Sequence, residues 1–375
     1  MWLVGVSLRL TLLAIPPVIP LIHRDLPLNE TGIAALSGLP VLLFAAAAVP
    51  GSLMIARLGA HRVLVVGLVL TAVASGLRGA GPSIAVLFGM TFLMGIGMAV
   101  SHPAIPSLIN VWLPDRVGIA TAVYVNGLLV GEMLSASLTL PLVLPLTGGR
   151  WAVGLAVWAV PVLLAGLLLA GMIGRLPDAS GSRAARWWPD WHLAETWQLG
   201  VLMAGASVGY LTANAFIPDF LRVGGQPALI GPCLTALNAG QVPASIVLAL
   251  TASTTVGRRA PLVAAGAGTL VSLGLFLAGP PWAQVLGAGM LGFFGAGIFV
   301  MALALPPMLA ARGDVHRLSA GMFAINYAYS FVAPLVGGAA WDLTGVPAIS
   351  FLPVVVSVAT ALLGIAVIPR ARLTK

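Results

Sequence analysis

Long apolar segments separated by short polar stretches repeat along the whole chain. A helix that crosses the hydrocarbon core of a bilayer needs about 20 mostly apolar residues. Twelve segments meet this length, and we expect a membrane-spanning helix at each of Trp2–Ile22, Thr31–Ile55, Val63–Ala80, Ser83–Ile109, Gly118–Leu144, Trp151–Gly174, Trp197–Leu221, Leu229–Thr254, Pro261–Ala278, Ala283–Ala310, Ser319–Ala340 and Val346–Ile368. The pattern therefore predicts an all-α polytopic membrane protein.

The longest polar interruption, Arg175–Glu195, lies between the sixth and the seventh segment. It is basic and rich in Trp, which is typical of an amphipathic stretch lying on a membrane surface. We therefore expect an N-terminal six-helix bundle over residues 1–174, a cytoplasmic amphipathic linker over 175–196 and a C-terminal six-helix bundle over 197–375.

The two halves resemble each other at a nearly constant distance along the chain. Gly59–Gly67 aligns with Gly257–Gly266, and the stretch that ends at Asn126 aligns with the one that ends at Asn326. The offsets of these and two further pairs lie between 197 and 201 residues. Two parallel six-helix repeats are a transporter layout, in which the substrate site lies between the halves.

Composition supports the membrane assignment and excludes several classes of protein. Charged residues make up 7% of the chain, whereas a soluble domain carries about 25%. The net charge is +8, but its Arg residues fall between apolar segments and form no basic run interleaved with aromatic residues, so no nucleic-acid partner is expected. A single cysteine, Cys233, makes no intrachain disulfide, and we see no cleavable signal peptide at Met1.

Lys and Arg in the connections predict the orientation, because cytoplasmic loops are enriched in them. With the N-terminus inside, thirteen fall on the cytoplasmic side and four outside, the outer four being Arg24, Arg78, Arg150 and Arg222. This asymmetry predicts a multi-pass protein of a bacterial inner membrane with both termini in the cytoplasm.

Ionisable residues within the spans are the first candidates for a site, because such residues usually mark a substrate or ion path. Arg9 lies near the middle of the first span, where its guanidinium can bind an anion. Alternatively it forms a structural ion pair with Glu132, the only carboxylate deep in any predicted span. Glu132 is a candidate for proton coupling, but a permanent ion pair with Arg9 would oppose its protonation. A third alternative is that Glu132 pairs with Arg9 in one conformational state of the protein and releases it in another.

His102 precedes Pro103 in the fourth span. In a functional role it titrates near neutral pH or binds substrate. In a structural role it hydrogen-bonds a backbone carbonyl that the proline leaves without a donor. Four other spans carry amide and hydroxyl side chains at similar depths. Taken singly these groups can join helices, but together they favour a shared cavity for a small polar or planar ligand. The predicted substrate-binding residues beside Arg9 are Tyr124, Asn126, Tyr210, Asn214, Asn238, Gln241, Asn326, Tyr327 and Tyr329.

The segment Gly51–Arg62 resembles the signature between the second and third helices of the major facilitator superfamily. Ala56 stands where that signature usually has an acid, which puts the family's outward-facing latch in doubt here. The resemblance implies a conformational gating loop with Gly51, Arg57, Gly59 and Arg62, to which His61 is added as a further match.

A narrower resemblance, to the branch of cyanate permeases and nitroimidazole transporters, rests on "SLRLTLLAIPPVIPLI", "GLR" at Gly76–Arg78, "GIGMAVSHPAIPSLINVWLPDRVG" and "GGRWAVGLAVW". The branch pattern has an arginine in the first helix, matched by Arg9, and one after the third, matched by Arg78. The resemblance implies a secondary transporter of a small, cyanate-like anion or planar polar molecule that works by alternating access as a monomer. A drug or nitroimidazole-type exporter, with protons as a candidate coupling ion, is the alternative.

Two other classes find little support in the sequence. A membrane-embedded enzyme needs a nucleophile with its base, a metal pair or paired aspartates, and no HExxH, GxSxG or paired intramembrane aspartates occur. A channel needs rings of charge or carbonyl filters, which the two-fold repeat does not favour. We therefore expect no enzymatic activity, no metal and no cofactor, and no GxxxxGK[ST] loop for ATP is present.

Overall fold

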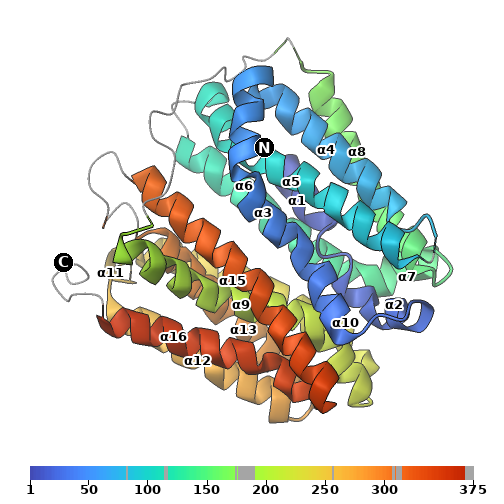
Figure 1. Ribbon diagram of the computed structural model, residues 1–375, viewed down its shortest axis with the longest axis vertical. Coiled ribbons are helices and arrows are strands. Elements are labelled where there is room, and N and C mark those ends of the chain that lie inside the picture. The colour runs from blue at the N-terminus through green and yellow to red at the C-terminus, as the bar shows by residue number, and fades with distance from the viewer. Residues whose placement is uncertain are drawn as a thin grey trace. The chain divides into compact units, whose positions relative to one another are not determined.

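The computed structural model describes residues 1–81, 83–113, 117–173, 175, 191–255, 257–305, 309 and 315–367, and these are almost entirely helical (Figure 1). The chain folds into two compact units. The first comprises Met1–Leu28 and Leu39–Arg183, and the second comprises Asn29–Gly38 and Ala184–Lys375. Most of the predicted linker, residues 176–190, lies outside the described residues.

The helices of the N-terminal half follow the predicted spans to within a few residues at most ends. In chain order they are α1 Trp2–Leu10, η1 Pro16–Val18, α2 Ile19–Asp25, α3 Glu30–Leu58, α4 Ala60–Leu77, α5 Ile84–Trp112, α6 Val117–Leu138, η3 Thr139–Val143, α7 Leu144–Leu146 and α8 Trp151–Ala170. α4 packs along both α5 and α8, and α1 packs along α6 (Figure 1).

The C-terminal half also consists of long α-helices joined by short turns and 3₁₀ helices. Its elements are α9 Ala194–Val223, η4 Pro227–Leu229, α10 Ile230–Ala239, α11 Gln241–Thr255, α12 Arg259–Ala278, α13 Pro281–Leu303, α15 Val315–Thr344, η5 Pro347–Phe351 and α16 Leu352–Val367. α9 lies at the centre of this unit, because it packs against α15, α16 and α13. A core that includes Met203, Met301 and Met322 fills the space between these helices.

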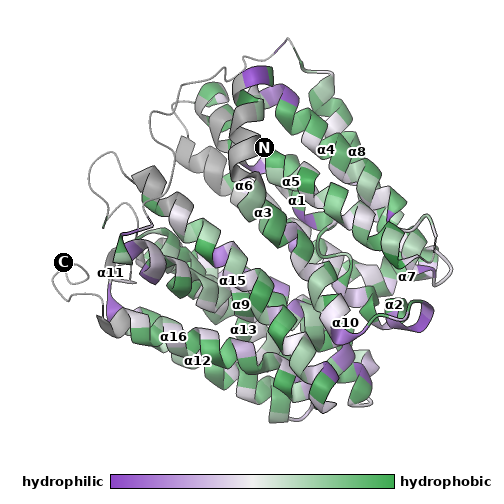
Figure 2. Cartoon of the chain, in the orientation of Figure 1, coloured by the Kyte–Doolittle hydropathy of each residue, from purple (hydrophilic) through white to green (hydrophobic). Residues whose placement is uncertain are grey.

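Within the described residues, nine helices are long and apolar enough to cross a membrane, and Glu30–Ala46 adds a shorter apolar helix. Figure 2 shows that apolar residues predominate along the described helices. The shorter helix corresponds to the second predicted span, and the first and the eighth spans are absent from these ten helices because each is broken into shorter helices. The structure thus confirms the all-α membrane fold, and ten of the predicted spans correspond to these apolar helices.

The break in the first span follows from its sequence. Pro16 and Pro17 have no backbone N–H, so a continuous helix would leave the carbonyls of Leu12 and Leu13 without donors. The chain instead ends α1 at Leu10 and resumes as the 3₁₀ turn η1 before α2. The eighth span breaks at Gly240, between α10 and α11. Pro141 coincides with the π-helical turn η3 in the fifth span, where prolines commonly disturb a helix.

Glycines bring α1 and α6 into very close contact. A Cβ at Gly127 would collide with the carbonyl of Trp2, and one at Gly131 with the carbonyl of Val6. From the other side, a Cβ at Gly5 would collide with the carbonyl of Tyr124. Such small residues let two membrane helices approach backbone to backbone. This contact fixes the register between the helix that carries Arg9 and the helix that carries Glu132.

The start of α3 packs against the end of α15, which explains why Asn29–Gly38 belongs to the second unit. The first N–H groups of a helix lack intrahelical partners and need acceptors from elsewhere. The carboxylate of Asp342 accepts hydrogen bonds from the backbone N–H groups of Glu30 and Thr31, each at 3.0 Å. Asn29 accepts from the backbone N–H of Gly32 at 2.9 Å, so the start of α3 is capped twice.

Candidate functional site

Arg9 and Glu132 form an ion pair inside the first unit. Nη1 of Arg9, on α1, lies 2.9 Å from Oε1 of Glu132, on α6. The Glu132 side chain is 5% exposed, whereas that of Arg9 is 22% exposed. The pairing that the sequence left open is therefore present in this structure. The remaining exposure of Arg9 means that a second acceptor can still reach its guanidinium.

The other predicted residues of the first unit lie near this pair or near the start of α1. His102, on α5, contacts the ring of Phe44 edge to face with the ring centroids 4.8 Å apart, and Arg9 lies within electrostatic reach of it. Among the described residues, Nε2 of His102 has no hydrogen-bond partner. Tyr124 is buried on α6, whereas Asn126 is exposed and accepts a hydrogen bond from the Trp2 indole at 2.9 Å.

In the second unit, three predicted residues form one hydrogen-bonded network between α9 and α10. The hydroxyl of Tyr210 donates to Oδ1 of Asn238 at 2.6 Å. Nδ2 of Asn238 donates to the carbonyl of Leu234 at 2.8 Å and lies 3.5 Å from Oδ1 of Asn214. Asn238 and Asn214 are buried, so their amides are held in place rather than solvated. The spacing of Tyr210 and Asn214 on one helix face puts them in the same network.

The polar residues of α15 are placed differently. Asn326 is fully buried, and neither atom of its amide has a hydrogen-bond partner among the described residues. An unpartnered buried amide is costly and is usually explained by a water or a ligand. Tyr327 stacks on Phe323 with the ring centroids 5.9 Å apart and the planes at 20°. Tyr329 and Gln241 are half-buried, and the contacts above do not join either of them to the network of α9 and α10.

The segment predicted as a conformational gating loop is mostly helical, and its role in gating stays a prediction. Gly51 and Arg57 lie within α3, and Arg62 lies exposed in the first turn of α4. The turn itself is Gly59, whose φ of +85° is rarely adopted by residues with a side chain.

His61 also differs from its expected role as a loop residue. It is buried, its Nε2 is hydrogen-bonded with the carbonyl of Leu169 at 3.0 Å, and its ring contacts Trp112 edge to face. This histidine therefore joins α4 to α8 and α5 at the end of the helix hairpin.

Arg78 corrects the sequence analysis most clearly, because it is not a residue of an outer loop. Its side chain is 0% exposed, and Nη2 donates to the carbonyl of Thr11 and to Oγ of Ser75, each at 2.8 Å. A pattern in the sequence could have revealed this: Thr71, Ser75 and Arg78 recur at helical spacing on one face of α4. Without Arg78, three basic residues remain in the outer set.

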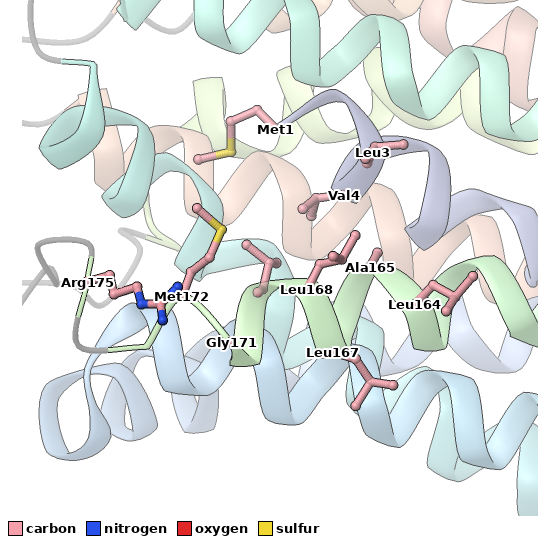
Figure 3. Close-up of a pocket in the computed structure, with 11 residues that line it drawn as sticks. Met1, Leu3, Val4, Leu164, Ala165, Leu167, Leu168, Gly171, Met172 and Arg175 are labelled. Carbon is pink, nitrogen blue, oxygen red and sulfur yellow. The ribbon is translucent and has the colours of Figure 1, made fainter.

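One apolar pocket among the described residues lies away from these polar groups. It has a volume of about 630 Å³ and is lined by apolar side chains of α1 and α8, with Arg175 at one end (Figure 3). Its lining residues include Leu3, Val4, Leu164 and Leu168. Apolar walls of this kind suit lipid chains rather than a polar substrate, so we base the site on Arg9 and not on this pocket.

The chemistry of the first-unit site follows from its charges. Two guanidinium groups, those of Arg9 and Arg78, lie in the interior of the unit, and Glu132 is the carboxylate that the described part of the unit places beside Arg9. Guanidinium groups stay protonated and bind carboxylate-like anions through charge-assisted hydrogen bonds. Such surroundings repel a metal cation and attract an anion.

Comparison with known proteins finds relatives along most of the chain. The chain is 26% identical over 353 residues to the cyanate transport protein CynX of Escherichia coli, covering 92% of this chain and 89% of that protein. It is 24% identical over 341 residues to the uncharacterized transporter YycB of Bacillus subtilis, covering 89% and 82%. It is 26% identical over 220 residues to the 2-nitroimidazole transporter of Escherichia coli, covering 58% and 56%.

Among solved structures, the fold is similar to that of a peptide transporter POT in complex with alafosfalin. The TM-score is 0.76 at 14% identity, with 100% of this chain and 95% of the other covered. The Major Facilitator Superfamily model matches residues 1–220, which is more than half of the chain. This chain, with its membrane-spanning helices and its transporter relatives, is a multi-pass membrane transporter and not an enzyme, and it belongs to the Major Facilitator Superfamily.

Proposed function

We propose that this protein is a secondary transporter that moves a small anion of the size and charge of cyanate, or a small planar polar molecule, by alternating access. The observation that carries the proposal is Arg9: a guanidinium inside the membrane span that is paired with Glu132 and still partly exposed. The similarity to the cyanate transport protein CynX supports an anion, and we extend that substrate class to this chain as part of the proposal.

In the proposed mechanism, the substrate anion and Glu132 compete for Arg9. Both acceptors form charge-assisted hydrogen bonds with a guanidinium, so exchanging one for the other costs less free energy than breaking the pair outright. Glu132 is 5% exposed, so releasing it from Arg9 leaves its negative charge in a low-dielectric interior, where an ionised carboxylate is costly. We propose that it then takes up a proton, which couples inward anion movement to protons.

We propose that the polar groups of the second unit contribute hydrogen bonds to the substrate. The support is the buried network of Tyr210, Asn214 and Asn238 and the buried amide of Asn326, which has no partner among the described residues. The tyrosines Tyr327 and Tyr329 provide faces on which a planar molecule can stack. Both termini are proposed to lie in the cytoplasm, because basic residues are concentrated in the connections on that side.

A second candidate substrate class is that of nitroimidazoles, moved outward. The relative that favours it is the 2-nitroimidazole transporter, to which the chain is 26% identical over 220 residues. A nitro group is a planar, electron-rich acceptor that a guanidinium can also bind, so both candidates use Arg9. A transport assay distinguishes the two candidates by the direction of transport and by the charge of the substrate that is moved.

The test is uptake of labelled cyanate and of labelled 2-nitroimidazole into proteoliposomes at set pH gradients. We expect wild-type protein to take up cyanate faster with an inward proton gradient, and Arg9→Gln to lose most of this uptake. Arg150→Gln is the matched control, because Arg150 is exposed just before α8 and lies outside both the site and the predicted gating segment. Unchanged cyanate uptake by Arg9→Gln, or transport of lipophilic cations only, would refute the proposal.

A further inference from the structure

A second arginine of the first unit is buried without a carboxylate beside it. Arg78 has 0% exposure, and its Nη2 donates two hydrogen bonds to neutral acceptors, the Thr11 carbonyl and the Ser75 hydroxyl. Among the described residues, its Nε and Nη1 groups have no partner. A buried guanidinium keeps its charge, so burial without a counter-ion costs several kcal/mol. Something outside this chain's described residues is needed to offset that charge.

The position of Arg78 is set by the break in the first span. Thr11 directly follows α1, and its carbonyl lies where the chain leaves the regular helix before Pro16 and Pro17. Arg78 caps this carbonyl with one N–H, which accounts for one part of the guanidinium only. Capping a carbonyl needs a single neutral donor, such as an amide or a hydroxyl. Capping of the Thr11 carbonyl therefore explains neither the full positive charge of the buried Arg78 nor its Nε and Nη1 donors, which have no partner among the described residues.

A buried hydroxyl beside Arg78 also lacks a partner. Arg78 donates to the carbonyl of Thr11, so Thr11 is a residue that the guanidinium contacts directly. Oγ1 of Thr11 has no hydrogen-bond partner among the described residues, and Thr11 is fully buried. Unpartnered donors of Arg78 and Thr11 therefore lie at the same break in the first span.

The charges of this region give the same answer. Arg9 and Glu132 offset each other at 2.9 Å, whereas the structure pairs Arg78 with no carboxylate among the described residues. One positive charge is therefore left over in the described interior of the first unit. A single monovalent anion offsets it, and a neutral molecule or a cation does not.

We infer that Arg78, with the hydroxyl of Thr11, forms a second binding position for a small monovalent anion at the break of the first span. This inference rests on the proposed function and adds a residue to it: the anion is held by Arg9 and by Arg78 at two successive positions. No atom of Arg78 is exposed here, so the anion enters only when the segment between α1 and η1 moves. That segment has no continuous helical hydrogen bonding and can move at lower cost than a regular helix.

The test uses the full-length protein and selenocyanate, a linear monovalent anion whose selenium is visible by anomalous scattering. Binding is measured by isothermal titration for the wild type, Arg78→Gln, Arg78→Lys and Arg9→Gln, with gluconate as the control anion. Ser101→Ala is the matched control, because the buried Ser101 hydroxyl donates within α5 to the carbonyl of Gly97 and has no part in the proposed site. We expect Arg78→Gln to weaken binding about tenfold or more, Arg78→Lys to weaken it less, and Ser101→Ala to bind as the wild type does.

The outcomes separate this inference from the proposed function. Binding lost in Arg9→Gln but equal to wild type in Arg78→Gln overturns the Arg78 position and keeps the proposed function. Binding lost in Arg78→Gln but kept in Arg9→Gln does the reverse, and no selenocyanate binding to the wild type overturns both. If Arg78→Gln does not fold, crystals of the wild type soaked in selenocyanate decide: a selenium peak beside Arg78 supports the inference, and a peak beside Arg9 alone, or none, refutes it.

Discussion

The ion pair between Arg9 and Glu132 leads to a quantitative prediction about stability. At 2.9 Å, two unit charges attract by about 6 kcal/mol at an effective dielectric constant of about 20, before desolvation is subtracted. Removing one partner of a buried pair typically costs about 3–5 kcal/mol, because the other charge is left uncompensated. Arg9 keeps 22% exposure, so water offsets part of this cost, and we expect Glu132→Gln to destabilise the protein by about 2–3 kcal/mol.

A double-mutant cycle with Arg9→Gln, Glu132→Gln and the double variant isolates the pair from other effects of each substitution. Unfolding is followed in mixed micelles, where the denaturing detergent is titrated and the transition is reversible. We expect the double variant to lose about 2 kcal/mol less stability than the sum of the two single losses, which is the coupling free energy of the pair. A cycle on the exposed pair Arg24 and Asp25 is the control, for which we expect less than about 0.5 kcal/mol.

The same cycle can refute the reasoning. If the effects of Arg9→Gln and Glu132→Gln add, so that the coupling is below about 0.5 kcal/mol, the two charges do not stabilise each other in the folded protein. The exchange of Glu132 for a substrate anion would then lose its physical basis, because there would be no pair for the anion to compete with.

Two further predictions concern the packing and the pH dependence. Gly131→Ala should destabilise the protein by about 1–3 kcal/mol, because the added Cβ would collide with a backbone carbonyl of α1. Gly89→Ala is the control and should not destabilise the protein, because the space around its Cβ is open. Thermal unfolding of both variants in detergent measures the difference. The hydrogen bond from Trp151, and after it the hydrogen bond from Arg24, lower the pKa of Asp25 below 3.8. These hydrogen bonds therefore stabilise the folded protein above pH 3.8, and the stabilisation is lost as the pH falls through the lowered pKa. Trp151→Phe should therefore have a lower free energy of unfolding than the wild type at pH 6, and this difference should become smaller below pH 3.8. A difference that stays constant with pH would contradict this reasoning.

Much of the fold could be predicted because membrane insertion imposes a local rule on the sequence. Each span needs a run of apolar residues, and most observed helices begin and end within a few residues of the predicted ones. The breaks in the first and eighth spans were not predicted, although Pro16, Pro17 and Pro243 stand at or near them. Prolines inside other spans, such as Pro161, leave the helix intact, so a proline alone does not show where a helix ends.

The candidate site was predictable only in part, for a related reason. A charged residue inside a span stands out in the sequence, so Arg9 and Glu132 were both identified, but their pairing depends on the glycine contacts that set the register of α1 against α6. Arg78 was misplaced because it follows the last apolar residues of its span, where arginines commonly reach the membrane surface. Its burial depends on an acceptor, Thr11, that lies 67 residues away in the chain.

The sequence by itself determined that this chain crosses a membrane repeatedly, and it identified Arg9 and Glu132 as charged side chains inside the membrane. These properties follow from the free energy of transferring each segment into hydrocarbon, which depends on composition along the chain. Only the tertiary structure decided which charge meets which partner: Glu132 for Arg9, and neutral acceptors for Arg78. Those choices depend on contacts between helices distant in sequence, because a buried charge is stabilised by groups within a few ångströms of it.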